Sequence, residues 1–218
     1  MTDNISRIRQ LIAEAKSQNV EDGSLEDFCR LQAGQLHRVI RLPLDAPEAA
    51  LASFITQYIE HVPDFLEALT ALMQETGIYE QGHVFLTIAE EFFISPPELI
   101  SEPSGLIGLL DEAYLSHRMI EEVSDRIQLT CGTALCPMDM NLSNVIVHAI
   151  LGEDFANQLD LAVHYAIEAL FNNDPLKAPQ FCTRLSSLQS SEYWQKTIAK
   201  WPSLAGDSSI ELDLEGWL

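Results

Sequence analysis

Apolar residues cover more than half of the circumference of the helix predicted from about Gly105 to Ile127. One face carries residues at helical spacing: Leu106, Leu110, Ala113, His117, Ile120 and Ile127. A second set widens that face: Leu109, Leu115, Met119 and Val123. A helix that is apolar on several sides must have neighbours on several sides. We therefore expect this segment to be the central helix of a multi-helix protein.

Helical spacing of apolar residues also predicts helices through most of the remaining chain. Pro47 and Pro63 suit the first turn of a helix, whereas Pro43 and Gly77 end the helices before them. The expected helices are 3–20, 24–42, 48–60, 63–76, 79–93, 105–127, 142–151 and 154–171, with one or two weaker helices within 178–201. The sequence therefore predicts an all-α protein, a bundle of about eight or nine helices that forms a single domain over residues 1–207.

The last segment, residues 208–218, has a different pattern. Its sequence SSIELDLEGWL alternates apolar and acidic residues with a period of two, which is typical of an extended chain. Soluble proteins seldom expose large apolar residues without a use for them. We expect an extended strap that packs on its own domain. The alternative is a short linear motif that binds a partner through Leu212, Leu214, Trp217 and Leu218.

The charge distribution constrains the partners. Twelve Lys and Arg residues stand against 33 Asp and Glu residues, a formal net charge of −21. No Lys or Arg lies between Leu42 and His117, or from Ile127 to Leu176. Nucleic-acid binding relies on Lys and Arg that release counterions, and anionic membranes repel acidic chains, so both partners are disfavoured. High net charge serves solubility in many proteins. The sharper hypothesis is a non-enzymatic interaction or adaptor protein that meets a basic protein partner.

The N-terminal residues and the cysteines indicate a location. Residues 1–10 are polar and precede no apolar region, so the sequence predicts no signal peptide, and no window is long and apolar enough to span a membrane. Without a secretory signal, the four cysteines are expected to be reduced thiols in a cytoplasmic protein. Cys131 and Cys136 are within reach of zinc spacing, but a second ligand pair is missing.

Histidine and glutamate pairs provide a second hypothesis for function. His117 with Glu121, and His164 with Glu168, are each one helical turn apart on two different predicted helices. Together with His148 they could converge on iron, manganese or zinc inside the bundle, and such a site could support oxidoreductase chemistry. A single histidine on an apolar face is more often a core residue than a metal ligand. We therefore keep the metal-binding bundle as the alternative to the interaction protein. No nucleophile elbow, phosphate loop or dinucleotide fingerprint is present.

A resemblance covers residues 92–126. Ile94-Ser95-Pro96, Glu98-Leu99-Ile100 and the run Gly108 to Ala113, GLLDEA, resemble the YkvA-like bacterial domain of unknown function. The resemblance implies a helical hairpin and no assigned reaction. The residues also have an interpretation of their own. Asp111 and Glu112 lie near the start of the predicted helix, where the positive end of the helix dipole stabilises carboxylates.

Overall fold

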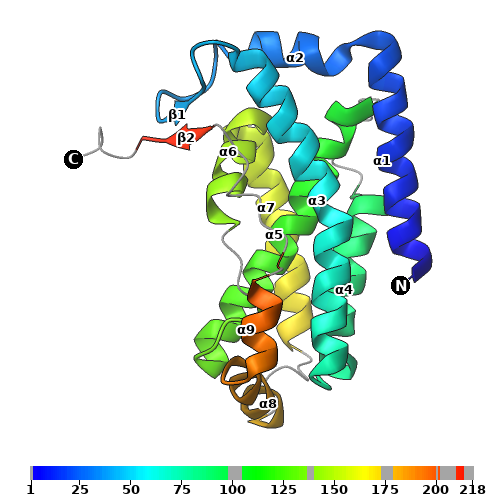
Figure 1. The fold of residues 1–218 in the computed structure, drawn as a ribbon, viewed down its shortest axis with the longest axis vertical. Helices are drawn as coiled ribbons and strands as arrows, with labels where there is room; N and C mark the ends of the chain where they lie inside the picture. The colour runs from blue at the N-terminus through cyan, green and yellow to red at the C-terminus, as the bar shows by residue number, and fades with distance from the viewer. Residues whose placement is uncertain are drawn as a thin grey trace.

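The protein is an all-α bundle, as the sequence predicts. The computed structural model describes residues 2–97, 105–136, 140–172, 179–199, 201 and 210–213. Within these ranges lie nine helices and two short strands (Figure 1). They are α1 (Thr2–Asp22), α2 (Ser24–Gln32), β1 (Ile40–Arg41), α3 (Pro47–Glu75), α4 (Tyr79–Ile94), α5 (Gly105–Cys131), α6 (Asn141–Leu151), α7 (Glu153–Asn172), α8 (Pro179–Gln189), α9 (Glu192–Ile198) and β2 (Glu211–Leu212).

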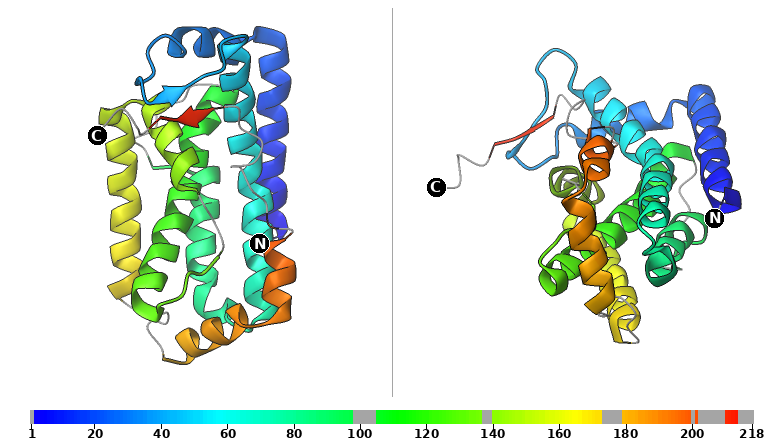
Figure 2. Two further views of the ribbon diagram at one scale, coloured as in Figure 1. Left: turned by 60° about the vertical axis from the view of Figure 1, so that its left-hand side comes forward. Right: turned by 60° about the horizontal axis from the view of Figure 1, so that its bottom comes forward.

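Helix α5 is central, which confirms the expectation from its wide apolar surface. It packs against α1, α2, α3, α4, α6, α7 and α8. In the left-hand view of Figure 2, α1, α3 and α4 lie to one side of it and α6 and α7 to the other, and Figure 1 shows α8 at the end remote from α2. The Ser116 hydroxyl of α5 donates to the Ala89 carbonyl of α4 across 2.6 Å. The two helices that the resemblance pairs are therefore neighbours.

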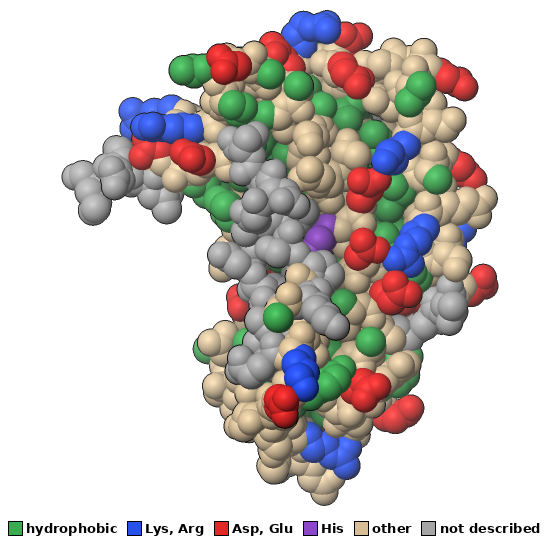
Figure 3. Space-filling view, viewed as in Figure 1, with side chains coloured by type: hydrophobic (Ala, Val, Ile, Leu, Met, Phe, Trp, Pro, Cys, Tyr) green, Lys and Arg blue, Asp and Glu red, His purple; other side chains and the backbone are tan. Residues whose placement is uncertain are grey.

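Helices α1 and α3 are joined at the surface by ion pairs. Arg9 of α1 bonds to Asp64 across 2.6 Å and to Glu67 across 3.0 Å, and Lys16 pairs with Glu60. Figure 3 shows basic and acidic side chains next to one another on this face. Two of the few basic residues are thus already matched by acids of the same chain.

Helix α3 corrects one predicted boundary. We expected Pro63 to begin a new helix, but α3 continues through it from Pro47 to Glu75. A proline inside a helix lacks one backbone hydrogen bond and costs about 3 kcal/mol. The residues around it are buried in the core: Tyr58, Ile59, Val62, Phe65 and Leu66. Each large apolar side chain contributes about 1.5–3 kcal/mol when buried, so their packing outweighs the defect.

Helix α2 corrects a second boundary. It ends at Gln32, whereas the sequence predicts a helix that continues to residue 42. No residue between Arg30 and Val39 is fully buried, so this stretch lacks the buried apolar face that would stabilise a longer helix. Instead the chain turns and forms β1, whose Ile40 is buried.

The C-terminal segment confirms the expected strap over the residues that are described. β2 pairs antiparallel with β1, with Ile40 opposite Leu212. The Asp213 amide donates to the Val39 carbonyl across 2.7 Å, and Asp213 also pairs with Arg41. Leu212 is half-buried against the core, so it is docked on its own domain. The other three residues proposed as a binding motif, Leu214, Trp217 and Leu218, lie outside the described residues.

The cysteines differ from the expectation of four reduced thiols. Cys131 at the end of α5 and Cys182 in α8 form a disulfide. They are 51 residues apart in the sequence, and the packing of α8 on the end of α5 is what brings them together. Cys29 and Cys136 are free and buried, as expected. The cytoplasmic location stays a prediction. Among the described residues no helix has the length and apolar character needed to cross a bilayer.

Candidate functional site

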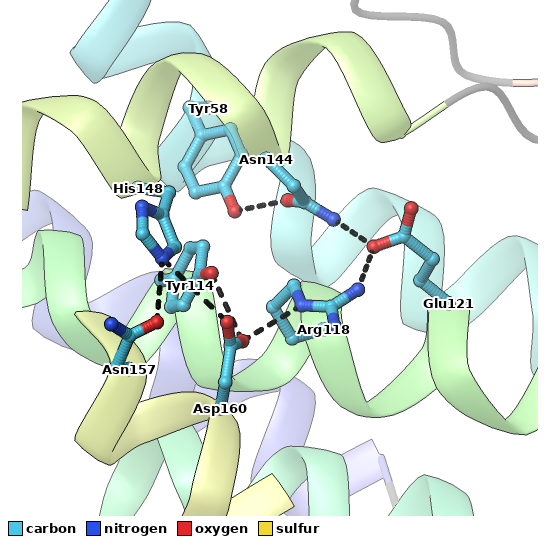
Figure 4. A network of polar contacts seen from close by, with 8 residues as sticks. All are labelled: Tyr58, Tyr114, Arg118, Glu121, Asn144, His148, Asn157 and Asp160. Carbon is cyan, nitrogen blue, oxygen red and sulfur yellow. Dashed lines mark hydrogen bonds and ion pairs between the residues drawn. The ribbon is translucent and has the colours of Figure 1, made fainter. Parts of the chain in front are cut away.

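A polar pocket of about 510 Å³ lies between α5, α6 and α7. Its lining consists of one basic side chain, two acidic ones, and tyrosine, asparagine, histidine and valine side chains: Tyr114, Arg118, Glu121, Asn141, Asn144, Val145, His148 and Asp160. Figure 4 shows most of these side chains converging from the three helices. This pocket brings more hydrogen-bonding and ionisable side chains together than three other pockets of the described residues, which lie beside Arg9 and Lys16, beside Ser6 and Gln74, and beside Cys182.

Helical spacing explains why these side chains meet. Tyr114, Arg118 and Glu121 are four and three residues apart, so they share one face of α5. Asn141, Asn144, Val145 and His148 share one face of α6 in the same way. The opposite faces are apolar and buried, for example at Val123 of α5 and Ile150 of α6. The core therefore anchors each helix and turns its polar stripe toward the pocket.

Arg118 is the centre of the pocket. Its Nε donates to Asp160 Oδ1 across 2.9 Å, and its Nη1 pairs with Glu121 Oε2. The Arg118 and Glu121 side chains are 23% and 10% exposed, so the pair is shielded from water. Burial by itself lowers the pKa of Arg118, whereas the carboxylates of Glu121 and Asp160 raise it. The effect of the carboxylates is larger, so the pKa of Arg118 lies above its ordinary value. The guanidinium is thus permanently charged and held from two sides.

A shell of hydrogen bonds fixes the two carboxylates. The Tyr114 hydroxyl donates to Asp160 Oδ1 across 3.0 Å. Asn144 donates from Nδ2 to Glu121 Oε2 across 2.6 Å and accepts from the Tyr58 hydroxyl, also across 2.6 Å. Burial raises the pKa of both tyrosines above the ordinary value, so both hydroxyls keep their protons and act as donors. Tyr58 belongs to α3, which ties the pocket floor to the bundle core.

His148 stands beside the outer oxygen of Asp160. Its Nε2 lies 3.8 Å from Asp160 Oδ2 and 3.4 Å from Asn157 Oδ1. The ring also packs edge-on against Tyr114, with 6.3 Å between the ring centroids. Within the described part of the chain, the hydrogen bonds from Tyr114 and Arg118 go to Asp160 Oδ1, and His148 is the nearest partner of Oδ2. The lining carries two carboxylates and one guanidinium, so its Asp, Glu and Arg side chains sum to a charge of −1.

The five residues predicted as metal ligands fall into separate places. Glu121 and His148 line the pocket. His117 is fully buried, and its Nε2 donates to the Tyr58 carbonyl across 3.1 Å. Glu168 bonds to Arg126 across 2.6 Å, and His164 is exposed on α7. Among the described residues no three His, Cys, Asp or Glu side chains are placed to hold a metal ion.

Sequence reasoning missed the other six pocket residues: Tyr114, Arg118, Asn141, Asn144, Val145 and Asp160. One signal could have found the centre of the site. Arg118 and Arg126 are the only basic residues between Arg41 and Lys177, and both lie on the helix expected to be central. A charged residue that is half-buried on a central helix needs an acidic partner. The partners, Asp160 and Glu168, are on a helix whose packing the sequence does not reveal.

Asp111 and Glu112 do not fit the helix-dipole interpretation, which is wrong. They are the seventh and eighth residues of α5, beyond its first turn, where the dipole effect has faded. Burial raises the pKa of Asp111 to about 6. Burial, and then the neighbouring Asp111, raise the pKa of Glu112 to about 8. Glu112 Oε2 is buried and finds no hydrogen-bond partner among the described residues. The structure therefore favours the neutral form of these carboxyl groups.

Comparisons with protein-family models, with curated proteins and with solved structures give no match for this chain. The resemblance of residues 92–126 to the YkvA-like domain therefore stays a prediction. Function has to be inferred from the pocket.

Proposed function

We propose that this is a non-enzymatic interaction protein that receives a cationic group of a basic protein partner in the pocket between α5, α6 and α7. One observation carries the proposal. Asp160 and Glu121 hold a single guanidinium between them, so the pocket keeps one negative charge that no Lys or Arg of its lining balances. A lysine ammonium or an arginine guanidinium would complete the charge balance at Asp160 Oδ2.

The charge of the whole chain supports this choice of partner. A formal net charge of −21 attracts cations and repels anions over long distances. Such fields raise the rate at which oppositely charged partners meet and suppress partners of like charge. The pocket then supplies what a diffuse acidic surface lacks, which is a specific geometry.

Rigidity of the carboxylates also supports binding. Asp160 accepts from Tyr114 and from Arg118, while Glu121 accepts from Arg118 and Asn144. Side chains that are already ordered lose little conformational entropy when a ligand arrives. A flexible surface carboxylate, in contrast, gains little from an ion pair because ordering it costs nearly as much as the contact yields.

The test compares two variants that change net charge equally. Asp160→Asn removes the pocket carboxylate, and Asp154→Asn removes an exposed carboxylate on the same helix. We would measure the anisotropy of a fluorescent peptide rich in Arg and Lys at low and high salt. The expected result is a loss of affinity of roughly tenfold or more for Asp160→Asn and little change for Asp154→Asn.

Equal effects of the two substitutions would show that the peptide senses only overall charge, and the pocket proposal would be wrong. Circular dichroism of both variants controls for folding. Affinity capture from a lysate at two salt concentrations then identifies natural partners, with Asp160→Asn as the matched negative bait.

A further inference from the structure

The disulfide between α5 and α8 is open to solvent on one side. Cys131 is the last residue of α5, and Cys182 is the fourth residue of α8. Cys182 is half-buried and lines a shallow hollow of about 440 Å³ together with hydroxyl side chains: Thr183, Ser186, Ser187 and Ser190. A small molecule in this hollow can approach the sulfur of Cys182, while Cys131 does not line it.

The two sulfurs lie at opposite ends of helices. Cys182 is in the first turn of α8, where the positive end of the helix dipole stabilises a thiolate. Cys131 lies at the carboxyl end of α5, where the dipole disfavours a negative charge. Once the bond is open, Cys182 is therefore the better nucleophile. Access through the hollow therefore favours attack at Cys182, and the helix dipoles make Cys182 the more reactive of the two thiols once the disulfide is open.

We propose that Cys182 is a thiol-exchange site for low-molecular-weight thiols and that Cys131 is its resolving thiol. An incoming thiolate attacks Cys182 Sγ through the hollow. The new sulfur–sulfur bond forms as the Cys131–Cys182 bond breaks, and Cys131 leaves as a thiolate that takes a proton from water. A second thiolate attacks the sulfur of the bound small molecule and releases Cys182. Two small thiols become one disulfide, and the protein gains two electrons and two protons.

Contacts other than the disulfide hold α8 in place, so exchange does not require unfolding. Phe181 and Leu185 are buried in the core. Arg184 donates to the Gly77 carbonyl across 2.6 Å, and Gln189 donates to the Ala134 carbonyl across 2.9 Å. The site can therefore cycle between oxidised and reduced forms in the native protein. A disulfide shielded from solvent on all sides would react only after the protein unfolds.

The experiment incubates the native full-length protein with reduced glutathione under non-denaturing conditions, quenches with acid and maps the adducts by mass spectrometry. The expected product is a glutathione adduct on Cys182, with Cys131 appearing as a free thiol. A matched pair of variants tests the asymmetry. In Cys131→Ser, Cys182 is the remaining thiol of the pair, and in Cys182→Ser, Cys131 is the remaining thiol. We expect iodoacetamide to alkylate Cys182 roughly tenfold faster than Cys131.

Cys29 and Cys136 are internal controls in the same sample. Both are buried, and burial raises the pKa of each thiol to about 12, so they should stay unmodified while the protein is folded. Modification of all four cysteines together would indicate unfolding and would overturn the proposal. So would a disulfide that stays intact until urea unfolds the protein, or faster alkylation of Cys131 than of Cys182.

Discussion

Arg118 of α5 donates to Asp160 of α7 across 2.9 Å, and these two residues are 42 positions apart in the sequence. The same two helices repeat the pairing further along, where Arg126 donates to Glu168 across 2.6 Å with the same separation of 42. Both ion pairs therefore fit one and the same register of α7 on α5. That register is what brings Asp160 into the pocket.

The two ion pairs should differ in their contribution to stability. Asp160→Ala leaves the shielded Arg118 with one carboxylate and removes the acceptor of Tyr114, so we expect a loss of about 1–3 kcal/mol in the free energy of unfolding. Glu168 is 42% exposed, so Glu168→Ala should cost less than about 1 kcal/mol. Urea unfolding of both variants measures the difference. Equal losses would contradict a central role for Arg118.

His117 should make the protein sensitive to acid. Burial is the main cause that lowers the pKa of His117 to about 3, and neighbouring His61 adds to it. The hydrogen bond to the Tyr58 carbonyl acts in the opposite direction and raises the pKa, but by less. An unfolded histidine has a pKa of about 6.5, so between these values the unfolded chain binds more protons. Stability from this group is complete above about pH 6.5 and falls as pH drops toward 3, by up to about 4 kcal/mol.

The variant His117→Gln tests this sign. It can still donate to the Tyr58 carbonyl, but it cannot take up a proton. Its unfolding free energy should change less between pH 7 and pH 4 than that of the wild type. An unchanged pH dependence would show that other groups control acid unfolding.

Glu112 should act in the opposite direction. Its folded pKa is raised to about 8, mainly by burial, so the folded state binds the proton more tightly than the unfolded chain. Stability therefore falls as pH rises from about 4.5 to about 8. Glu112→Gln should raise the unfolding free energy by about 2–4 kcal/mol at alkaline pH and have little effect near pH 4.5.

The exposed Glu75 provides the control for that substitution, since Glu75→Gln changes net charge equally. Thermal unfolding at several pH values compares the two variants. A stabilisation by Glu112→Gln that is the same at every pH would contradict the proton linkage. Together, His117 and Glu112 predict a stability maximum between about pH 5 and 6.5.

Metal content separates the two functional hypotheses. The separation of His117, His164 and Glu168 leads us to expect less than stoichiometric iron, manganese and zinc in protein purified without chelators. Elemental analysis of the native protein measures this. Near-stoichiometric metal that is lost in a His117→Ala, His164→Ala double variant would instead support the metal-binding bundle over the interaction protein.

The strap should matter for stability more than for binding. Ile210 is buried, and Leu212 faces Ile40 in the two-stranded sheet. Deleting residues 210–218 should therefore lower the unfolding free energy by about 1–3 kcal/mol. Affinity for the basic peptide should stay unchanged, because the pocket lies on α5, α6 and α7. Loss of binding at unchanged stability would instead favour the linear motif.

Several elements could be predicted from the sequence because their causes are local. Apolar spacing together with proline and glycine placed α4, α6 and α7 within a few residues of their observed bounds, and it identified α5 as central. Glu121 and His148 were named as functional candidates and do lie in the pocket, though beside an arginine rather than in a metal cluster. The other candidates failed to converge, because a helical turn defines a face but not which helix that face meets.

The all-α class, the central helix and the acidic character follow from the amino-acid sequence alone, since the spacing of apolar residues and the composition do not depend on tertiary contacts. The tertiary structure decided that α3 continues through Pro63, because packing on both sides of the proline outweighs one lost hydrogen bond. It also decided that Asp160 meets Arg118 and that Cys131 meets Cys182. These contacts depend on the register between packed helices, which arises from the fit of whole surfaces rather than from any short run of residues.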